Sequence, residues 1–393
     1  MKTFSLDQIL VKVTSKAFSA IEKKANHKHS LIHLVIFSIL ASLFSSFPSY
    51  DIVGSDEMKE NWTAILEQTE HPFAPMNFHS SSHQANLSFR LTPVLIARCL
   101  KVDTVLEFLV LQFVAFVCLI TGIALLFKKI DNDPVVHYLL TLSVAFTFVG
   151  NVLCSDYRGF FDVFAYLFIV GSMLFTNSIL VFFMLLFAYF TDERALFASG
   201  LISIFIYFNE TSGNLRSGSK WFKILSRPRV LALVFSWISY IALRLLLSSI
   251  FGLHSNSEGL VDYLLTQTIH QINILPFGAW TGLEGFWLLV IFSVFVLFMN
   301  KNYLVMSWYL LALLVVVFIG IWVFDVTRSM AYLLPSIFLS LSILTKTDSE
   351  NILRSIAFFV LVLSIFPTYY AGGPNEVHWL FPLPIQILRM LFF

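Results

Sequence analysis

The feature that most constrains the fold of this chain is a succession of apolar runs separated by short polar clusters. A helix needs about 20 apolar residues to cross the roughly 30 Å hydrocarbon core of a bilayer. Hydrophobic residues make up 58% of the chain and charged residues 12%, whereas a soluble domain has about 45–50% and about 25%. So few charges could not cover the surface of a soluble fold. The pattern therefore predicts an all-α polytopic membrane protein.

About eleven of the apolar runs are long enough, or nearly long enough, to be transmembrane helices. Three consecutive runs between 160 and 208 are short, so one of them could be re-entrant, or two could form one broken helix. The predicted spans are approximately 31–49, 104–127, 135–153, 160–175, 178–190, 195–208, 230–252, 286–299, 303–324, 330–345 and 355–371.

Lysine and arginine residues set the predicted orientation, because cytoplasmic loops carry an excess of both. With a cytoplasmic N-terminus and alternating spans, most of these cations lie inside, most acids lie outside, and the C-terminus is outside. We expect a multi-pass protein of a cell membrane, the inner membrane of a bacterium, with its active face extracytoplasmic. The sequence predicts three parts, which are a cytoplasmic basic segment at 1–30, one transmembrane domain at 31–371 and an extracytoplasmic tail at 372–393. Within the transmembrane domain, the outer loops are 50–103 and 253–285, and a basic cytoplasmic loop lies at 209–229.

Several classes of function are disfavoured by what the sequence lacks. The net charge is +1 and no long basic run occurs, so no nucleic-acid partner is expected. P-loop, HExxH, GxSxG and Rossmann signatures are missing, which argues against an ATP-driven enzyme or a soluble-type nucleotide-sugar enzyme. The three cysteines are widely spaced and predict neither a disulfide framework nor a metal site.

The first outer loop carries one group of candidate site residues. Asp51 follows the first span directly, and low-dielectric surroundings there would raise the pKa of its carboxyl group and suit a general base. Asp56 lies five residues later and is an alternative base. His79, His83 and Arg90 are candidate substrate contacts. The competing interpretation is that these residues begin a solvated loop, and the histidine spacing is too loose to predict a metal site.

Two short outer turns carry more charge than a tight turn needs. Asp156, Arg158 and Asp162 lie between the third and fourth spans, and Asp325 and Arg328 lie between the ninth and tenth. An arginine at the edge of a bilayer offers bidentate donors to the phosphate of a lipid carrier. The alternatives are that the first turn caps a helix and that the second holds a local Asp–Arg pair.

Three further features could belong to the same outer face. The segment from Leu87 to Leu100 is apolar but too short to span, and it predicts an interfacial helix with Pro93 near its start. Trp280, in the later outer loop, could stack on a sugar face or anchor the chain at the interface. Arg244 lies within a predicted span, where a charge is costly and usually functional or paired.

This layout resembles the GT-C superfamily of membrane glycosyltransferases. The resemblance rests on Asp51 just beyond the first span, on the long first outer loop with its interfacial helix, and on Asp156 and Asp162 at the fourth span. It implies that Asp51 is the catalytic base, that Asp156 is its partner, and that an outer arginine, Arg158 or Arg328, holds the phosphate. The motifs are short, and no acidic pair directly adjoins the first span.

The leading hypothesis is therefore a transferase that moves a sugar from a polyprenyl-phosphate carrier to a glycan, lipid or protein acceptor, with the lipid bilayer as its setting. The sequence implies no definite cofactor and leaves open whether Mg²⁺ or Mn²⁺ is required. The nearest alternative is a polysaccharide polymerase or ligase of the O-antigen type. Alternatives of other classes are a transporter or flippase for a lipid-linked or small polar substrate, a histidine-dependent membrane acyltransferase, and a structural subunit.

Overall fold

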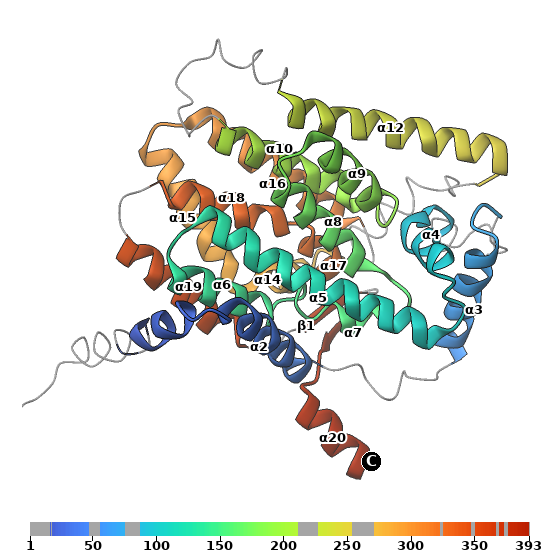
Figure 1. Ribbon diagram of the computed structural model, residues 1–393, viewed down its shortest axis with the longest axis horizontal. Helices are drawn as coiled ribbons and strands as arrows, with labels where there is room; N and C mark the ends of the chain where they lie inside the picture. The colour runs from blue at the N-terminus through green and yellow to red at the C-terminus, as the bar shows by residue number, and fades with distance from the viewer. Residues whose placement is uncertain are drawn as a thin grey trace, which may run out of the picture.

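The computed structural model describes residue 16 and residues 18–46, 56–74, 87–210, 227–253, 271–322, 325–346, 350–366, 369–372 and 376–392. This part of the chain is almost entirely helical, with one two-stranded sheet (Figure 1). Its elements are α2 (Ser30–Ser45), α3 (Asp56–Glu70), α4 (Leu91–Leu100), α5 (Val105–Ile130), α6 (Pro134–Val144), α7 (Leu153–Asp156), α8 (Asp162–Leu174), α9 (Ser178–Tyr189), α10 (Arg194–Glu210), α12 (Pro228–Phe251), α14 (Leu275–Leu283), η3 (Glu284–Phe286), α15 (Trp287–Met299), α16 (Tyr303–Ile321), α17 (Val326–Ala331), α18 (Leu334–Leu344), α19 (Glu350–Ser364), β1 (Tyr369–Gly372), β2 (Glu376–Trp379) and α20 (Leu383–Phe392).

Within these described ranges, five helices are long and apolar enough to cross a membrane. A sixth is added if Phe18–Ala25 and Ser30–Ser45, which meet at a bend of 119°, form one span. The chain is therefore an all-α membrane protein, as predicted. Shorter apolar helices, including α6, α8 and α9, occupy further predicted spans. The five long helices are Val105–Ile130, Pro228–Phe251, Leu275–Met299, Tyr303–Ile321 and Val326–Leu344.

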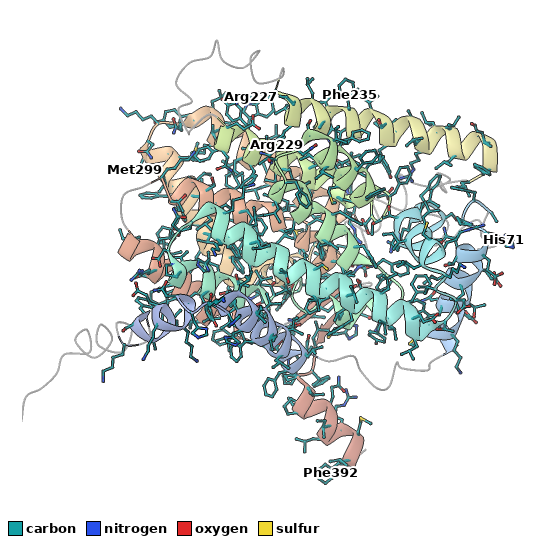
Figure 2. The ribbon with its side chains drawn as sticks, in the orientation of Figure 1. His71, Arg227, Arg229, Phe235, Met299 and Phe392 are labelled. Atoms are coloured by element: carbon teal, nitrogen blue, oxygen red, sulfur yellow. The ribbon has the colours of Figure 1, made fainter. Side chains whose placement is uncertain are left out.

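The buried fraction of the side chains differs between an inner helix and two outer helices. Every residue of α18 is buried, and α18 packs against α10 and α15. In α12 and α16, by contrast, only 28% of the apolar window is buried, and large side chains such as Phe235 and Phe318 are more than half exposed. Figure 2 shows Phe235 on the outer side of α12. Because such surfaces are stable in hydrocarbon and not in water, α12 and α16 face lipid and α18 forms the interior.

The end of the chain differs from the prediction. A span was expected over 355–371, but α19 ends at Ser364 and residues 369–372 form β1. Strand β1 pairs antiparallel with β2, with Tyr369 opposite Trp379. Pro367 follows α19 in the sequence, and proline cannot donate the backbone hydrogen bond that a continuing helix requires. The single-helix prediction was wrong here, and the tail after 371 contains β2 and α20.

Two other predicted boundaries also need correction. The span predicted over 135–153 is helical only to Val144, after which the chain forms tight turns. Gly150 lies in these turns, where an added Cβ would collide with the carbonyl oxygen of Val144. Within the predicted outer loop 253–285, α14 begins at Leu275, and its helical path breaks at Glu284, where φ is 48°. The helix predicted within 87–100 is confirmed as α4, with Pro93 in its first turn.

Charged side chains that join helices to one another gather in two layers. One, the arginine layer, holds Arg90, Asp156, Asp162, Asp192, Arg194, Asp325 and Arg328 and is described below. The opposite layer contains the pairs Lys129–Leu174, Asp133–Arg354, Lys346–Phe208, Asn209–Ser342 and Glu210–Arg229. Helix α8, 13 residues long, begins in the first layer and ends in the second, as does α10 with 17 residues. At about 1.5 Å per residue, the layers lie about 20–25 Å apart.

Candidate functional site

The centre of the arginine layer is a buried ion pair between Asp162 and Arg328. Asp162 is the first residue of α8 and Arg328 lies in α17, and their side chains are 0% and 2% exposed. Nε of Arg328 donates to Oδ2 of Asp162 at 2.6 Å, and its Nη1 donates to Oδ2 of Asp325 at 2.6 Å. The hydroxyl group of Tyr332 donates to Oδ1 of Asp162 at 3.2 Å. A guanidinium group is thus held between two carboxylates from different parts of the chain.

A second charged group comes from the turn between α9 and α10. Arg194 donates from Nε and Nη2 to the two oxygens of Asp192, at 2.8 and 2.5 Å. Arg90 approaches the same carboxylate, with Nη2 at 3.4 Å from Oδ2. Burial alone would raise the pKa of Asp192, but Arg194 outweighs burial and holds this pKa well below its usual range. Nη2 of Arg194 also lies 3.5 Å from Oδ1 of Asp162, so the two groups form one network.

Asp156 has contacts typical of a helix cap. Its Oδ1 and Oδ2 accept hydrogen bonds from the backbone nitrogens of Asp162 and Val163, at 3.0 and 2.8 Å. Its own carbonyl oxygen accepts one from Gln112 of α5 at 3.0 Å. Burial, and then the nearby carboxylate of Asp162, raise the pKa of Asp156 well above its usual value. Asp156 therefore fixes the start of α8, and it lines none of the three cavities described below.

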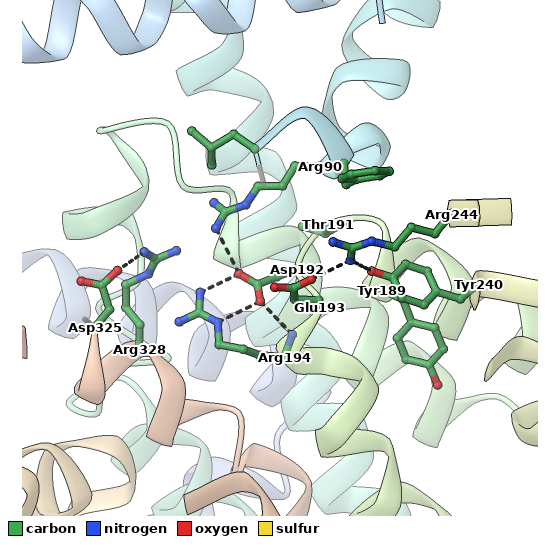
Figure 3. Close-up of a pocket in the computed structure, with 12 residues that line it drawn as sticks. Arg90, Tyr189, Thr191, Asp192, Glu193, Arg194, Tyr240, Arg244, Asp325 and Arg328 are labelled. Carbon is green, nitrogen blue, oxygen red and sulfur yellow. Dashed lines mark hydrogen bonds and ion pairs between the residues drawn. The ribbon is translucent and has the colours of Figure 1, made fainter. Parts of the chain in front are cut away.

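The network forms one wall of an arginine-rich pocket (Figure 3). The cavity has a volume of about 70 Å³. It is lined by Leu87, Phe89, Arg90, Tyr189, Thr191, Asp192, Glu193, Arg194, Tyr240, Arg244, Asp325 and Arg328. Nη2 of Arg328 is buried and makes no hydrogen bond to any described residue. A buried donor left unpaired costs about 1–3 kcal/mol, so an anionic oxygen in the pocket would be favoured there.

Arg244 reaches the pocket from α12. Its Nη1 donates to Oε2 of Glu193 and to the hydroxyl group of Tyr240, both at 2.6 Å. Its guanidinium carbon lies 4.4 Å from the centre of the Phe89 ring. The predicted mid-span charge is therefore paired, and it belongs to the site. Seven further residues of α12 follow Arg244, which places the pocket about 10 Å below the end of this helix.

An apolar groove of about 550 Å³ adjoins the arginine pocket between α4, α9 and α12. On each of these elements, a residue of the groove is the chain neighbour of a residue of the pocket. The three pairs are Leu91 with Arg90, Phe190 with Tyr189, and Leu243 with Arg244. Further groove residues are Leu95, Ile96, Leu100, Leu186, Phe187 and Leu247. The site thus has one end lined by four arginines and three acids and another end lined by apolar side chains.

The structure brings together some of the predicted site residues and not others. Arg90, Asp325 and Arg328 line the arginine pocket, and Asp162 supports Arg328 from behind. Arg158 lines a second cavity, which it shares with Asp325. Trp280 is 42% exposed on α14 and lines none of these cavities. Asp51, His79 and His83 lie outside the described residues, as does the side chain of Asp56.

Sequence reasoning missed the contribution of Asp192, Glu193 and Arg194. No candidate site residue was named in the break between the predicted spans 178–190 and 195–208. A four-residue break holding two acids and one arginine is more charge than a turn requires. The same criterion singled out Asp156 and Arg158, and it would have found these three residues as well.

The described residues do not fit a divalent cation. Mg²⁺ takes oxygen ligands, commonly one or two carboxylates with water or substrate phosphate. Asp162, Asp192 and Asp325 each pair instead with a guanidinium group. No group of three or more histidine, cysteine, aspartate or glutamate side chains in the described ranges could hold a metal ion.

Comparisons of this chain with protein-family models, with curated proteins and with solved structures found no match. The site therefore has to be interpreted from its own chemistry, which joins a pocket rich in guanidinium groups to an apolar groove among membrane helices.

Proposed function

We propose that this protein is an integral membrane glycosyltransferase that transfers a sugar from a polyprenyl-phosphate carrier to a glycan, lipid or protein acceptor on the extracytoplasmic face. The observation that carries the proposal is that the apolar groove lies beside the arginine pocket, with neighbouring residues of the chain lining each of them. A lipid phosphate has an anionic head and a hydrocarbon tail, so it matches both ends. Guanidinium groups bind phosphate oxygens through paired, charge-assisted hydrogen bonds.

The proposal places the arginine layer outside and the opposite layer inside, with about eleven crossings and a cytoplasmic N-terminus. The opposite layer holds Lys129, Arg229, Lys346 and Arg354, which suits the cytoplasmic excess of lysine and arginine. Helices α8 and α10 each run from one layer to the other. The arginine layer then lies within reach of the outer leaflet, where the phosphate of a lipid carrier resides.

In the proposed reaction, a carboxylate removes the proton from an acceptor hydroxyl group, and the hydroxyl oxygen attacks the anomeric carbon of the sugar. The bond from that carbon to the lipid phosphate breaks, and the phosphate leaves with the electron pair. Asp51 is the proposed base. The unpaired Nη2 of Arg328 and the guanidinium of Arg244 would stabilise the negative charge on the leaving phosphate. Asp156 would act by holding α8 in place.

Two variants test this proposal. In a strain where loss of the gene alters a cell-surface glycan, Asp51→Asn should abolish complementation while the protein still inserts into the membrane. Purified wild-type protein should bind undecaprenyl phosphate, and Arg244→Gln should weaken that binding. Full activity of the Asp51 variant would remove this residue as base. Equal binding of undecaprenyl phosphate and of the matching uncharged alcohol would exclude a phosphate site in the arginine pocket.

Two other functions share part of the geometry. Four arginines around one pocket also suit a polymerase or ligase acting on a polyprenyl diphosphate, and the length of the glycan product distinguishes it from a transferase of single sugars. Broken helices and recessed charges are also found in transporters. A transporter would move its substrate across the membrane without forming a covalent product.

A further inference from the structure

A second cavity, here called the C-terminal chamber, has a volume of about 420 Å³. One wall is the segment around α7, a second is Asp325, and the rest comes from β1, β2 and α20. Figure 1 shows α20 projecting from the body of the molecule beyond β1. The volume lies in the range of about 300–1,000 Å³ that is typical of small-molecule pockets. The strands and helix of the tail therefore enclose space large enough for a ligand.

The lining of the chamber is aromatic and balanced in charge. Its rings include Tyr157, Phe160, Tyr370, Trp379 and Phe381. Its cations, Arg158 and Arg389, are matched by the acids Asp325 and Glu376. This balance favours a neutral ligand with several hydrogen-bonding groups over an anion.

Trp379 supplies a specific hydrogen-bond donor. Its indole Nε1 is buried and makes no hydrogen bond to any described residue. An indole nitrogen can only donate, so it would be satisfied by an oxygen atom of a ligand. A sugar presents such oxygens along its edge, and the C–H groups on its face pack against aromatic rings.

The chamber and the arginine pocket meet at one partition. Asp325 lines both cavities. Its Oδ2 accepts from Arg328 and its Oδ1 accepts from the hydroxyl group of Tyr370, each at 2.6 Å. The ring of Phe160 lines the chamber and lies 4.0 Å from the guanidinium carbon of Arg328. Two ligands, one in each cavity, would therefore lie on the two sides of Asp325 and Arg328.

We propose that the C-terminal chamber binds the acceptor of the reaction, and that this acceptor is a neutral saccharide. This inference rests on the proposed transferase function and names the acceptor class. Trp379 donates to a sugar oxygen, the aromatic rings pack on sugar faces, and Asp325 marks the end of the chamber at which the reacting hydroxyl group lies. The exposed residues Glu376 and His378 form the rim toward water.

Strand β2 offers a matched pair of positions for the main test. Neighbouring side chains of a strand point to opposite faces, and both His378 and Val377 are exposed, but only His378 lines the chamber. His378→Cys and Val377→Cys are each labelled after folding with a bulky, membrane-impermeant maleimide, and the labelled parent chain is the reference. Relative to the labelled parent chain, sugar incorporation into glycan should fall at least tenfold for labelled His378→Cys and stay within twofold for labelled Val377→Cys. Equal activity of the two labelled variants would overturn the proposal.

A second test separates this proposal from the proposed function. Trp379→Phe should lower sugar incorporation about tenfold, whereas binding of undecaprenyl phosphate should stay within twofold of wild type. Trp308→Phe, on the exposed face of α16, is the control. If wild type binds no undecaprenyl phosphate and loss of the gene changes no glycan, the proposed function fails. If wild type does bind undecaprenyl phosphate and loss of the gene does change a glycan, but Trp379→Phe retains full incorporation, only the acceptor site fails.

Discussion

The arginine layer and the opposite layer join the same helices by different means. In the opposite layer, Lys129 and Lys346 donate to backbone carbonyl oxygens, and the Arg354–Asp133 pair is 22% and 8% exposed. In the arginine layer, Asp162 and Arg328 are 0% and 2% exposed, and each contacts more than one charged partner. Shared partners occur in both layers, since Arg354 also contacts Glu22 and Glu210 contacts two arginines. The difference is burial, because the opposite layer is partly exposed and the centre of the arginine layer is closed off.

This difference indicates that the network has a purpose other than stability. Exposed ion pairs contribute about 0–1 kcal/mol, which is enough to tie helix ends together. Buried pairs lose several kcal/mol of hydration per ion, and well-packed apolar residues often replace them without loss of stability. Ionisable groups within a membrane protein are costly and usually functional. The partly exposed contacts of the opposite layer therefore show which contacts are enough to join the helices. The additional buried charged groups of the arginine layer are explained by a role in the site.

The largest expected effect comes from removing one partner of the central pair. Asp162→Leu leaves the guanidinium of Arg328 without one of its two carboxylate partners, so the free energy of unfolding should fall by about 3–5 kcal/mol. Thermal unfolding of the purified protein in detergent measures this loss. Glu210→Leu, which removes the carboxylate that faces Arg229 in the opposite layer, is the matched variant. A similar loss for both would remove the distinction between the layers.

A smaller effect is expected when the charge at Arg328 is kept. Arg328→Lys retains a cation but loses the fork that bridges Asp162 and Asp325. We expect sugar transfer to fall about 10–100-fold, equivalent to about 1.4–2.7 kcal/mol, with a smaller loss of stability than Asp162→Leu causes. Activity and unfolding are measured on the same preparation. Unchanged transfer would show that the fork is dispensable.

Arg244 tests the partly exposed edge of the arginine layer. Its side chain is 22% exposed and pairs with Glu193, so Arg244→Gln should change stability by less than about 1 kcal/mol. The affinity for undecaprenyl phosphate should nevertheless fall about tenfold, which corresponds to about 1.4 kcal/mol. A titration of the lipid with purified protein measures it. Loss of stability without loss of affinity would assign Arg244 to packing alone.

The smallest effect is expected in the opposite layer. Arg354→Gln removes the contacts with Asp133 and Glu22, which are partly exposed, and should cost about 0–1 kcal/mol, with sugar transfer unchanged. Unfolding and transfer are compared with wild type. A tenfold loss of transfer would mean that both layers take part in the reaction.

Much of the fold followed from local sequence pattern. Apolar run lengths located the helices, and charge in short breaks pointed to Asp162, Asp325 and Arg328 before their contacts were known. Which residues pair could not be predicted, because Asp162 and Arg328 are 166 positions apart and meet only through packing of α8 against its neighbours. The same limit hid the capping role of Asp156, whose partners depend on how the turn after α7 folds. Asp51 lies outside the described residues, so its role stays a prediction.

The unequal lengths of the helices have a consequence for how a lipid would enter. Helices α8 and α9 have 13 and 12 residues, whereas α5 and α12 have 26 and 24. Helices α5 and α12 are long enough to match a bilayer of ordinary thickness, so the surrounding membrane need not thin around the protein. The arginine layer, at which α8 begins, is set about 10 Å below the end of α12. A carrier lipid would then enter laterally from its leaflet, and its head group would move deeper into the membrane by that distance. The head group would lose water there, and the arginines would replace that water as hydrogen-bond donors.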